Sequence, residues 1–250
     1  MTAEGAPTRE ILGVNVAAVT VDQFIELMVA AARERRHWRV GYVNAASYNL
    51  IAADRRYAEA MRAADLLYAD GQSVVWASRY LGRPLPERVN AGDCFDRFCE
   101  ACARANLTLY LLGSRAGVAE RAAQNLKERC PGLRIVHARD GHFEPALTDA
   151  IVAEINHFAP DFLIVGMGAP RQEFWTAERF DRLNVGVAWC VGALFEYLAG
   201  ETPRAPVWVR KAGLEWLFRL IIEPRRLWRR YLIGNWTFLR RVLRSRRRTA

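Results

Sequence analysis

The chain has 250 residues, of which 52% are hydrophobic and 25% charged, so one large core can form and intrinsic disorder is excluded over most of the length. The net charge of +9 is concentrated at one end, because residues 203–250 hold 14 basic and 2 acidic residues while residues 1–202 hold 22 and 25. That cationic tail also carries four of the eight tryptophans, which favours a polyanionic or membranous partner over a simple metabolic role.

Residues 11–160 alternate between apolar strands and amphipathic helices. In the first helix the apolar residues Phe24, Ile25, Met28 and Val29 recur with helical period. We predict helices at residues 21–35, 46–62, 74–81, 94–105, 118–129 and 148–157, and strands at residues 39–43, 66–69, 107–112, 133–138, 162–165 and 185–191. Continuous apolar strands between helices predict an α/β fold, a Rossmann-like parallel sheet with helices on both faces.

The chain changes character after residue 202. We expect residues 1–202 to form the α/β domain and residues 203–250 a basic, tryptophan-rich helical appendage, with helices at 207–222 and 225–244. Pro224 precedes the second of these helices, where proline is tolerated in a first turn. The most apolar stretch, residues 214–222, is interrupted by Glu215 and Arg219, which excludes a membrane-spanning helix there.

The cysteine count and the N-terminal residues lead us to expect a protein that resides in a reducing cytoplasm. Five cysteines are an odd number without disulfide-like spacing, and residues 1–9 contain no apolar segment typical of an export signal. Cys99 and Cys102 have a spacing that zinc and redox sites use, but they fall within a predicted helix. We therefore favour buried, small hydrophobic side chains at both positions.

Polar and glycine residues follow nearly every predicted strand. In parallel α/β sheets ligands bind beyond the carboxyl ends of the strands, so these residues are the candidates for a site. They are Asn44, Asp70, Gly71, Gly113, Ser114, Arg115, Asp140, Gly141 and residues 166–172. Glycine turns that lead into helices form anion sites from backbone N–H groups, which suggests a nucleotide or sugar nucleotide. For Gly113 a purely structural role in a tight turn is equally compatible with the sequence.

Asp70 is the best candidate for a general base. It follows an apolar strand and precedes Gly71, which permits close approach of a ligand to the backbone. The same position also suits an N-cap of the helix predicted at 74–81, and the residues leave both interpretations open. The four histidines have no metal-ligand spacing, and Ser73 and Ser114 lack the context of a nucleophile, so neither metal-bound nor acyl-transfer chemistry is supported.

Five segments together resemble a known family. They are residues 42–45 (YVNA), 69–71 (ADG), 81–89 (LGRPLPERV), 112–115 (LGSR) and 166–173 (GMGAPRQE). In order and spacing they are similar to the WecG/TagA/CpsF bacterial glycosyltransferases, glycosyltransferase family 26. The resemblance runs from about residue 11 to residue 243.

The resemblance implies an inverting, metal-independent enzyme without a cofactor. Its members move a sugar from a UDP-sugar to a polyprenyl-diphosphate-linked saccharide destined for a cell-surface polymer. The implied donor sugar is of the N-acetylmannosamine type in the first place, or its uronic acid or glucose. The implied location is peripheral, on the cytoplasmic face of the bacterial inner membrane, and an oligomer is compatible with the sequence.

The resemblance also assigns roles to individual residues. Asp70 matches the proposed catalytic base, and Asn44, Arg88 and Gln172 match pocket residues, although an arginine in a loop is more often a solvated charge. The predicted substrate-binding residues are these three pocket residues together with the turn residues Gly113, Ser114 and Gly168. One position departs from the wall-teichoic-acid branch, which carries threonine where this chain has Tyr42, and a bulky phenol reshapes that part of the pocket.

The appendage implied by the resemblance closes over the site at the membrane, and Arg219, Arg226 and Arg229 match its functional arginines. On one continuous helix these three would fall within an arc of roughly 80°, although Pro224 interrupts the pattern. Guanidinium groups suit a diphosphate, and tryptophans with interspersed arginines suit an anionic membrane surface. Packing of some of these aromatic side chains in the core is the alternative.

Three functions other than sugar transfer are compatible with parts of the sequence. A nucleic-acid-binding protein would use the Arg/Trp tail for phosphates and stacking, but it leaves the ordered polar residues at the strand ends unexplained, and we expect no nucleic-acid partner. A nicotinamide-dependent oxidoreductase should show a dinucleotide fingerprint, which the sequence lacks. A non-catalytic, membrane-associated scaffold of a polysaccharide-synthesis complex remains the third alternative.

Overall fold

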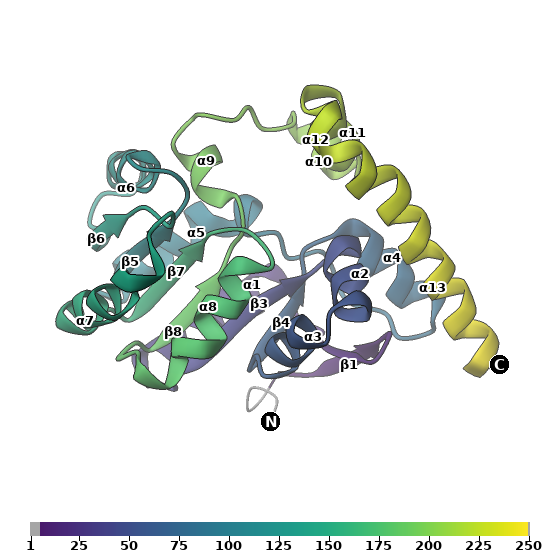
Figure 1. Cartoon of the computed structure of the whole chain (residues 1–250), viewed down its shortest axis with the longest axis horizontal. Helices are drawn as coiled ribbons and strands as arrows, with labels where there is room; N and C mark the ends of the chain where they lie inside the picture. Colours follow the sequence, from purple (N-terminus) through teal and green to yellow (C-terminus); the bar gives the residue numbers. More distant parts are fainter. Residues whose placement is uncertain (1–5, 250) are drawn as a thin grey trace.

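A computed structural model describes residues 6–249, apart from the side chains of residues 211, 226, 248 and 249. Its centre is a parallel sheet of six strands, flanked by helices on both faces, with a helical segment across one end (Figure 1). In spatial order the strands are β4 (Leu66–Ala69), β3 (Trp38–Val43), β8 (Val187–Cys190), β7 (Phe162–Gly166), β5 (Thr108–Gly113) and β6 (Arg134–Arg139). The predicted α/β architecture is confirmed.

The two sheet faces pack against different sets of helices. One face packs against α1 (Val21–Arg33), α5 (Ala91–Arg104) and α6 (Val118–Arg129). The other face is covered by α2 (Ala45–Ala53), α3 (Arg55–Arg62), α4 (Gln72–Tyr80), α7 (Thr148–Phe158) and α8 (Arg171–Arg179). Successive strand residues alternate between the faces, as Ile164 and Val165 of β7 do, and both faces are apolar.

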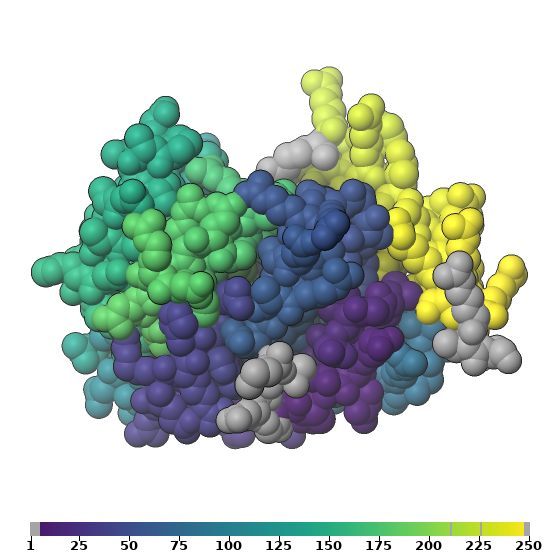
Figure 2. Space-filling model, turned by 60° about the horizontal axis from the view of Figure 1, so that its bottom comes forward, coloured from purple at the N-terminus to yellow at the C-terminus, as the bar shows by residue number. Residues whose placement is uncertain are grey.

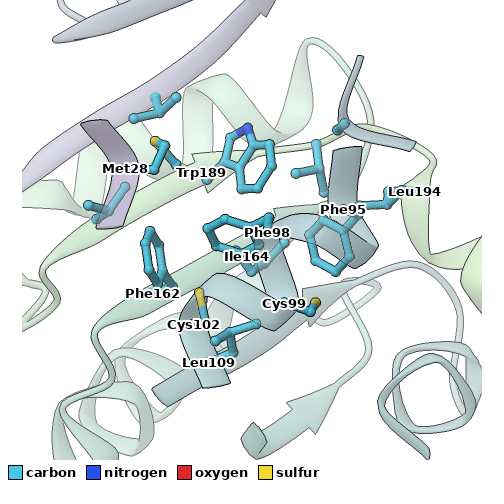
Figure 3. Packing of buried hydrophobic residues seen from close by; sticks show 14 of the residues in the cluster. Met28, Phe95, Phe98, Cys99, Cys102, Leu109, Phe162, Ile164, Trp189 and Leu194 are labelled. Carbon is cyan, nitrogen blue, oxygen red and sulfur yellow. The ribbon is translucent and has the colours of Figure 1, made fainter. Parts of the chain in front are cut away.

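The cysteines lie in this core. Cys99 and Cys102 of α5 belong to the same buried hydrophobic cluster as Phe98 and Trp189 (Figure 3). All five cysteines are unpaired and buried, and burial raises the pKa of Cys99 and Cys102 well above the ordinary thiol value. The interpretation of this pair as small hydrophobic residues is confirmed.

Two differences from the predicted elements have local causes. The helix expected at 46–62 is two helices, because Asp54 adopts extended backbone and its carboxylate caps the backbone N–H of Tyr57 at 3.1 Å. The N-terminal hairpin β1 (Thr8–Ile11) and β2 (Val14–Ala17) is absent from the prediction. Its two-residue turn places Leu12 and Gly13 at positive φ, and leucine is not a residue that signals such a turn.

The appendage begins after α9 (Leu194–Leu198). Its elements are α10 (Val207–Lys211), α11 (Glu215–Ile222), α12 (Pro224–Trp228), the π-helical η3 (Arg229–Ile233) and α13 (Gly234–Thr249). The single helix predicted at 207–222 is wrong, because the chain turns at Gly213, which has a φ of +75°. Phe238 and Val242 of α13 are buried in the same cluster as Tyr48 of α2, so the appendage packs firmly on the body.

Among the described residues, no helix is long and apolar enough to cross a membrane.

Candidate active site

A cavity of about 800 Å³ lies between the carboxyl ends of the strands and the appendage. Sheet order determines which strand ends reach it. β4, β3 and β8 are neighbours, and the registers pair Val43 with Ala69, so the residues after these two strands emerge side by side. The body residues around its polar end are Tyr42, Asn44, Asp70, Arg88, Asn90, Gly168 and Gly192.

Asp70 lies in this cavity wall directly after β4. Its backbone N–H donates to the Val43 carbonyl at 3.0 Å, and its Oδ1 accepts a hydrogen bond from Asn90 Nδ2 at 2.7 Å. Helix α4 has Gly71 as its N-cap, and no side chain in the described part of the chain caps it. Asp70 is therefore not the N-cap of α4, and it lines the cavity instead.

The surroundings of Asp70 strengthen it as a base. Burial raises the pKa of its carboxyl group above the ordinary value of 3.8, against the effect of the Arg88 guanidinium, which lowers the pKa. Glu215 of the appendage raises the pKa further, and hydrogen bonds from Asn44 and Asn90 lower it. The net direction is upward, so this carboxylate holds a proton more tightly than an exposed aspartate does.

Asn44 has two roles at the start of α2. Its side-chain oxygen accepts hydrogen bonds from the backbone N–H groups of Ala46 (3.0 Å) and Ser47 (3.1 Å), which closes a capping box. This cap fixes the side chain beside Asp70 at the cavity wall. The predicted pocket residue therefore lies in the pocket and also begins the helix.

Arg88 lies beside Asp70 because its loop returns to the end of β4, where the Val89 N–H donates to the Ala69 carbonyl at 2.9 Å. Its guanidinium pairs with Asp93 on the body and, at 3.2 Å, with Glu215 of α11. Arg88 therefore connects the loop beside Asp70 to the appendage and is not a solvated surface charge.

Asp93 also forms ion pairs with two arginines of the appendage. Arg204 donates to Asp93 Oδ1 at 2.7 Å, and Arg210 pairs with the same oxygen. Arg204 also donates to Asn90 Oδ1 at 3.2 Å, and Asn90 in turn donates to Asp70. A chain of hydrogen bonds thus runs from the linker before α10 to the carboxylate of Asp70.

The predicted appendage arginines do not share one face. The helix breaks at Glu223, whose backbone leaves the helical region before Pro224, so Arg219 and Arg229 belong to separate helical segments. Arg219 lines the cavity and lies over the Tyr197 ring at 5.6 Å, whereas Arg229 is exposed and lies over Trp228. The side chain of Arg226 is outside the described set. Arg230 also lines the cavity.

Three of the predicted substrate-binding residues are not part of the cavity wall. Gln172 is fully buried, and its Oε1 accepts a hydrogen bond from the Gly192 N–H at 3.0 Å, so it holds a loop that lines the cavity. Gly113 packs against the Gly166 backbone, and Ser114 Oγ donates to Glu196 at 2.8 Å, which anchors α9. Gly168, at a φ of +77°, does line the cavity.

Within the described residues no group of three or more His, Cys, Asp and Glu side chains is placed to hold a metal ion.

The residues that sequence reasoning missed are mainly ones whose partners are distant in the chain. Asn90 carries only the local signal of an N-cap before α5, which it also is. Arg204 and Glu215 carry none, because their partners Asn90 and Arg88 lie more than a hundred residues away.

Comparison with known proteins decides the family. The chain matches the sequence model described as the glycosyl transferase WecG/TagA/CpsF family over residues 9–250. The chain belongs to this family.

Curated relatives extend the comparison. Proteins of Staphylococcus aureus strains NCTC 8325 / PS 47 and COL are 30% identical to this chain over 222 residues, which cover 88% of this chain and 87% of each relative. A protein of strain MW2 is 29% identical over the same length. All three are named N-acetylglucosaminyldiphosphoundecaprenol N-acetyl-beta-D-mannosaminyltransferase.

Proposed function

We propose that this protein transfers a sugar from a UDP-sugar to a saccharide linked to a polyprenyl diphosphate. The observation that carries the proposal is the position of Asp70, a carboxylate of raised pKa in a cavity that also holds Arg219 and Arg230 of the appendage. A base beside cationic side chains suits a hydroxyl acceptor and a diphosphate in one site. The printed names of the Staphylococcus aureus relatives describe such an acceptor, which supports the proposal.

The proposed step is a direct displacement. Asp70 takes the proton from an acceptor hydroxyl as that oxygen forms a bond to the anomeric carbon of the donor. The bond from this carbon to the UDP oxygen breaks, UDP leaves with the electron pair, and the configuration inverts. Asn44, fixed by its cap, and Gly192, held by Gln172, lie where they can orient the sugar.

The leaving UDP and the acceptor diphosphate both need positive charge. Arg219 and Arg230 line the cavity, and we assign them to the acceptor diphosphate, with Arg226 and Arg229 as the remaining candidates from the sequence. Arg88 and the backbone at Gly168 lie on the body side of the same cavity and would stabilise the UDP. In this proposal arginine and backbone donors neutralise the phosphates, and no metal or cofactor takes part.

The outer surface of the appendage suits a membrane. Its exposed apolar side chains include Val207, Trp208, Ile221, Trp228 and Trp236, and arginines lie between them. In the space-filling view the appendage forms one edge of the molecule, with side chains that project beyond the body (Figure 2). We propose that this edge rests on anionic lipid at the cytoplasmic face of the bacterial inner membrane, since tryptophan favours the headgroup boundary.

Asp70→Asn tests the proposal. The variant keeps the shape of the side chain but cannot take the proton, so we expect UDP-sugar binding to survive and transfer to fall by at least about a hundredfold. The assay incubates the protein with UDP-N-acetylmannosamine, other UDP-sugars and a short-chain lipid-diphosphate N-acetylglucosamine, and identifies products by mass. Asp181→Asn, at an exposed position on the body, is the matched control. Turnover by Asp70→Asn close to that of the control would refute the assignment, and no product with any donor would favour the scaffold.

A further inference from the structure

Part of the cavity wall comes from α4 and α13, and we call this part of the cavity the arm. From α4 it takes Gln72, Ser73, Trp76, Ala77 and Tyr80, which lie on one face of the helix. From α13 it takes Asn235, Phe238, Leu239, Val242 and Leu243, again with helical spacing. None of these ten described wall residues is charged, although arginines flank them along α13. The two helices therefore present uncharged faces to one space.

The arm has a buried floor and an exposed apolar rim. Phe238 and Val242 are buried against the body. Trp76 of α4 and Leu239 of α13 keep 51% and 44% of their surface exposed. Apolar side chains that line a cavity and stay exposed indicate a ligand surface, because packing against protein would have covered them.

The arm joins the polar part of the cavity where the appendage arginines lie. Arg230 and Arg219 belong to the same cavity wall as Asp70 at one side and α13 at the other. A ligand with its sugar at Asp70 and its diphosphate at these arginines has its next atoms at the mouth of the arm. The wall from residue 235 to residue 243 extends about 12 Å along α13. That length takes the first isoprene units of a lipid and leaves the rest outside.

We propose that the arm between α4 and α13 binds the isoprene units of the acceptor lipid that lie nearest its diphosphate. This inference rests on the proposed function, since it places one more part of the same acceptor. Continuity with the cationic part of the cavity and the lack of charge in the arm select a diphosphate-headed chain over a free fatty acid or a peptide. The arm thus recognises the lipid next to its headgroup, in addition to any contact of the appendage with the bilayer.

The test compares two water-soluble acceptors with the same sugar diphosphate, one esterified with geraniol and one with methanol, in the absence of membranes. For the unaltered protein we expect the KM of the geranyl acceptor to be at least about tenfold lower, which is the effect of burying one or two apolar groups. Leu239→Ser should remove most of this difference by raising the geranyl KM, with the KM of the UDP-sugar unaffected. Leu147→Ser, at a body leucine that is 48% exposed, is the matched control and should keep the full preference.

Binding measured by calorimetry with geranyl diphosphate and methyl diphosphate gives a second readout that does not need turnover. Equal affinities of the two diphosphates, or an equal loss of both in Leu239→Ser, would overturn the inference. Transfer without any preference for the geranyl acceptor would likewise overturn it while the proposed function stands. Absence of transfer together with a geranyl preference in binding would instead contradict the proposed function and leave the lipid site supported.

Discussion

Replacing Glu173 with glutamine should make the stability of this protein less dependent on pH. Glu173 lies in the first turn of α8, is 7% exposed, and accepts a hydrogen bond from Gln172 Nε2 at 2.8 Å. Burial raises the pKa of its carboxyl group from 4.5 to about 7, against the hydrogen bonds from Gln172 and its own backbone. Tyr42, Tyr57 and Cys190 surround it, and none of them supplies a positive charge.

The sign follows from proton binding. Because the pKa is higher in the folded state, the folded protein binds the proton more tightly, and the stability present below pH 4.5 is lost as the pH rises to about 7. A shift of this size corresponds to about 3 kcal/mol at 1.36 kcal/mol for each pH unit. Glu173→Gln preserves the shape and the acceptor for Gln172 but carries no charge. We therefore expect the difference in free energy of unfolding between the variant and the unaltered protein to be about 3 kcal/mol more favourable to the variant at pH 8 than at pH 4.

Urea unfolding followed by tryptophan fluorescence at pH values from 4 to 8 measures this difference. Glu120→Gln, at an exposed position on α6, is the control and should show no such change with pH. A constant difference between Glu173→Gln and the unaltered protein across this range would refute the reasoning. Such a result would mean that water or a positive charge stabilises the Glu173 carboxylate in the folded protein.

Three further predictions concern the hydrogen-bond network around Asp70 and the phosphate charge in the proposed mechanism. Asn90→Ala removes the hydrogen bond to Asp70, so kcat should fall about tenfold or more and the acidic limb of the pH profile should move to higher pH, measured with the transfer assay. Asp93→Ala leaves Arg204 and Arg210 without the carboxylate that they contact. We expect the free energy that holds the appendage on the body to fall by about 2 kcal/mol and limited proteolysis of the appendage to become faster. Cleavage at an unaltered rate would contradict this expectation. Full transfer activity should survive treatment with EDTA, since arginines and backbone groups carry the phosphate charge in the proposed mechanism, and loss restored by a divalent cation would contradict it.

Local sequence patterns predicted much of the body because the spacing of apolar residues along the chain reports which face of each element is buried. The strands at 66–69 and the helix at 118–129 have the predicted bounds, since continuous apolar runs and helical periodicity are local properties. The same patterns missed the hairpin before α1, whose Leu12–Gly13 turn carries no usual turn signal, and α8, which follows a glycine-rich segment.

For the site, the sequence by itself determined the chemistry available: polar residues after the strands, with Asp70 foremost, and a strongly basic tail. Tertiary structure alone decided which of them meet. The order β4-β3-β8 brings Asn44 and Asp70 to one cavity and leaves Ser114, after β5, outside its wall. The break before Pro224 likewise separates Arg219 from the later arginines, of which Arg230 lines the cavity and Arg229 does not. Strand order and helix docking depend on the burial of surfaces that are far apart in the chain, and no local pattern encodes that.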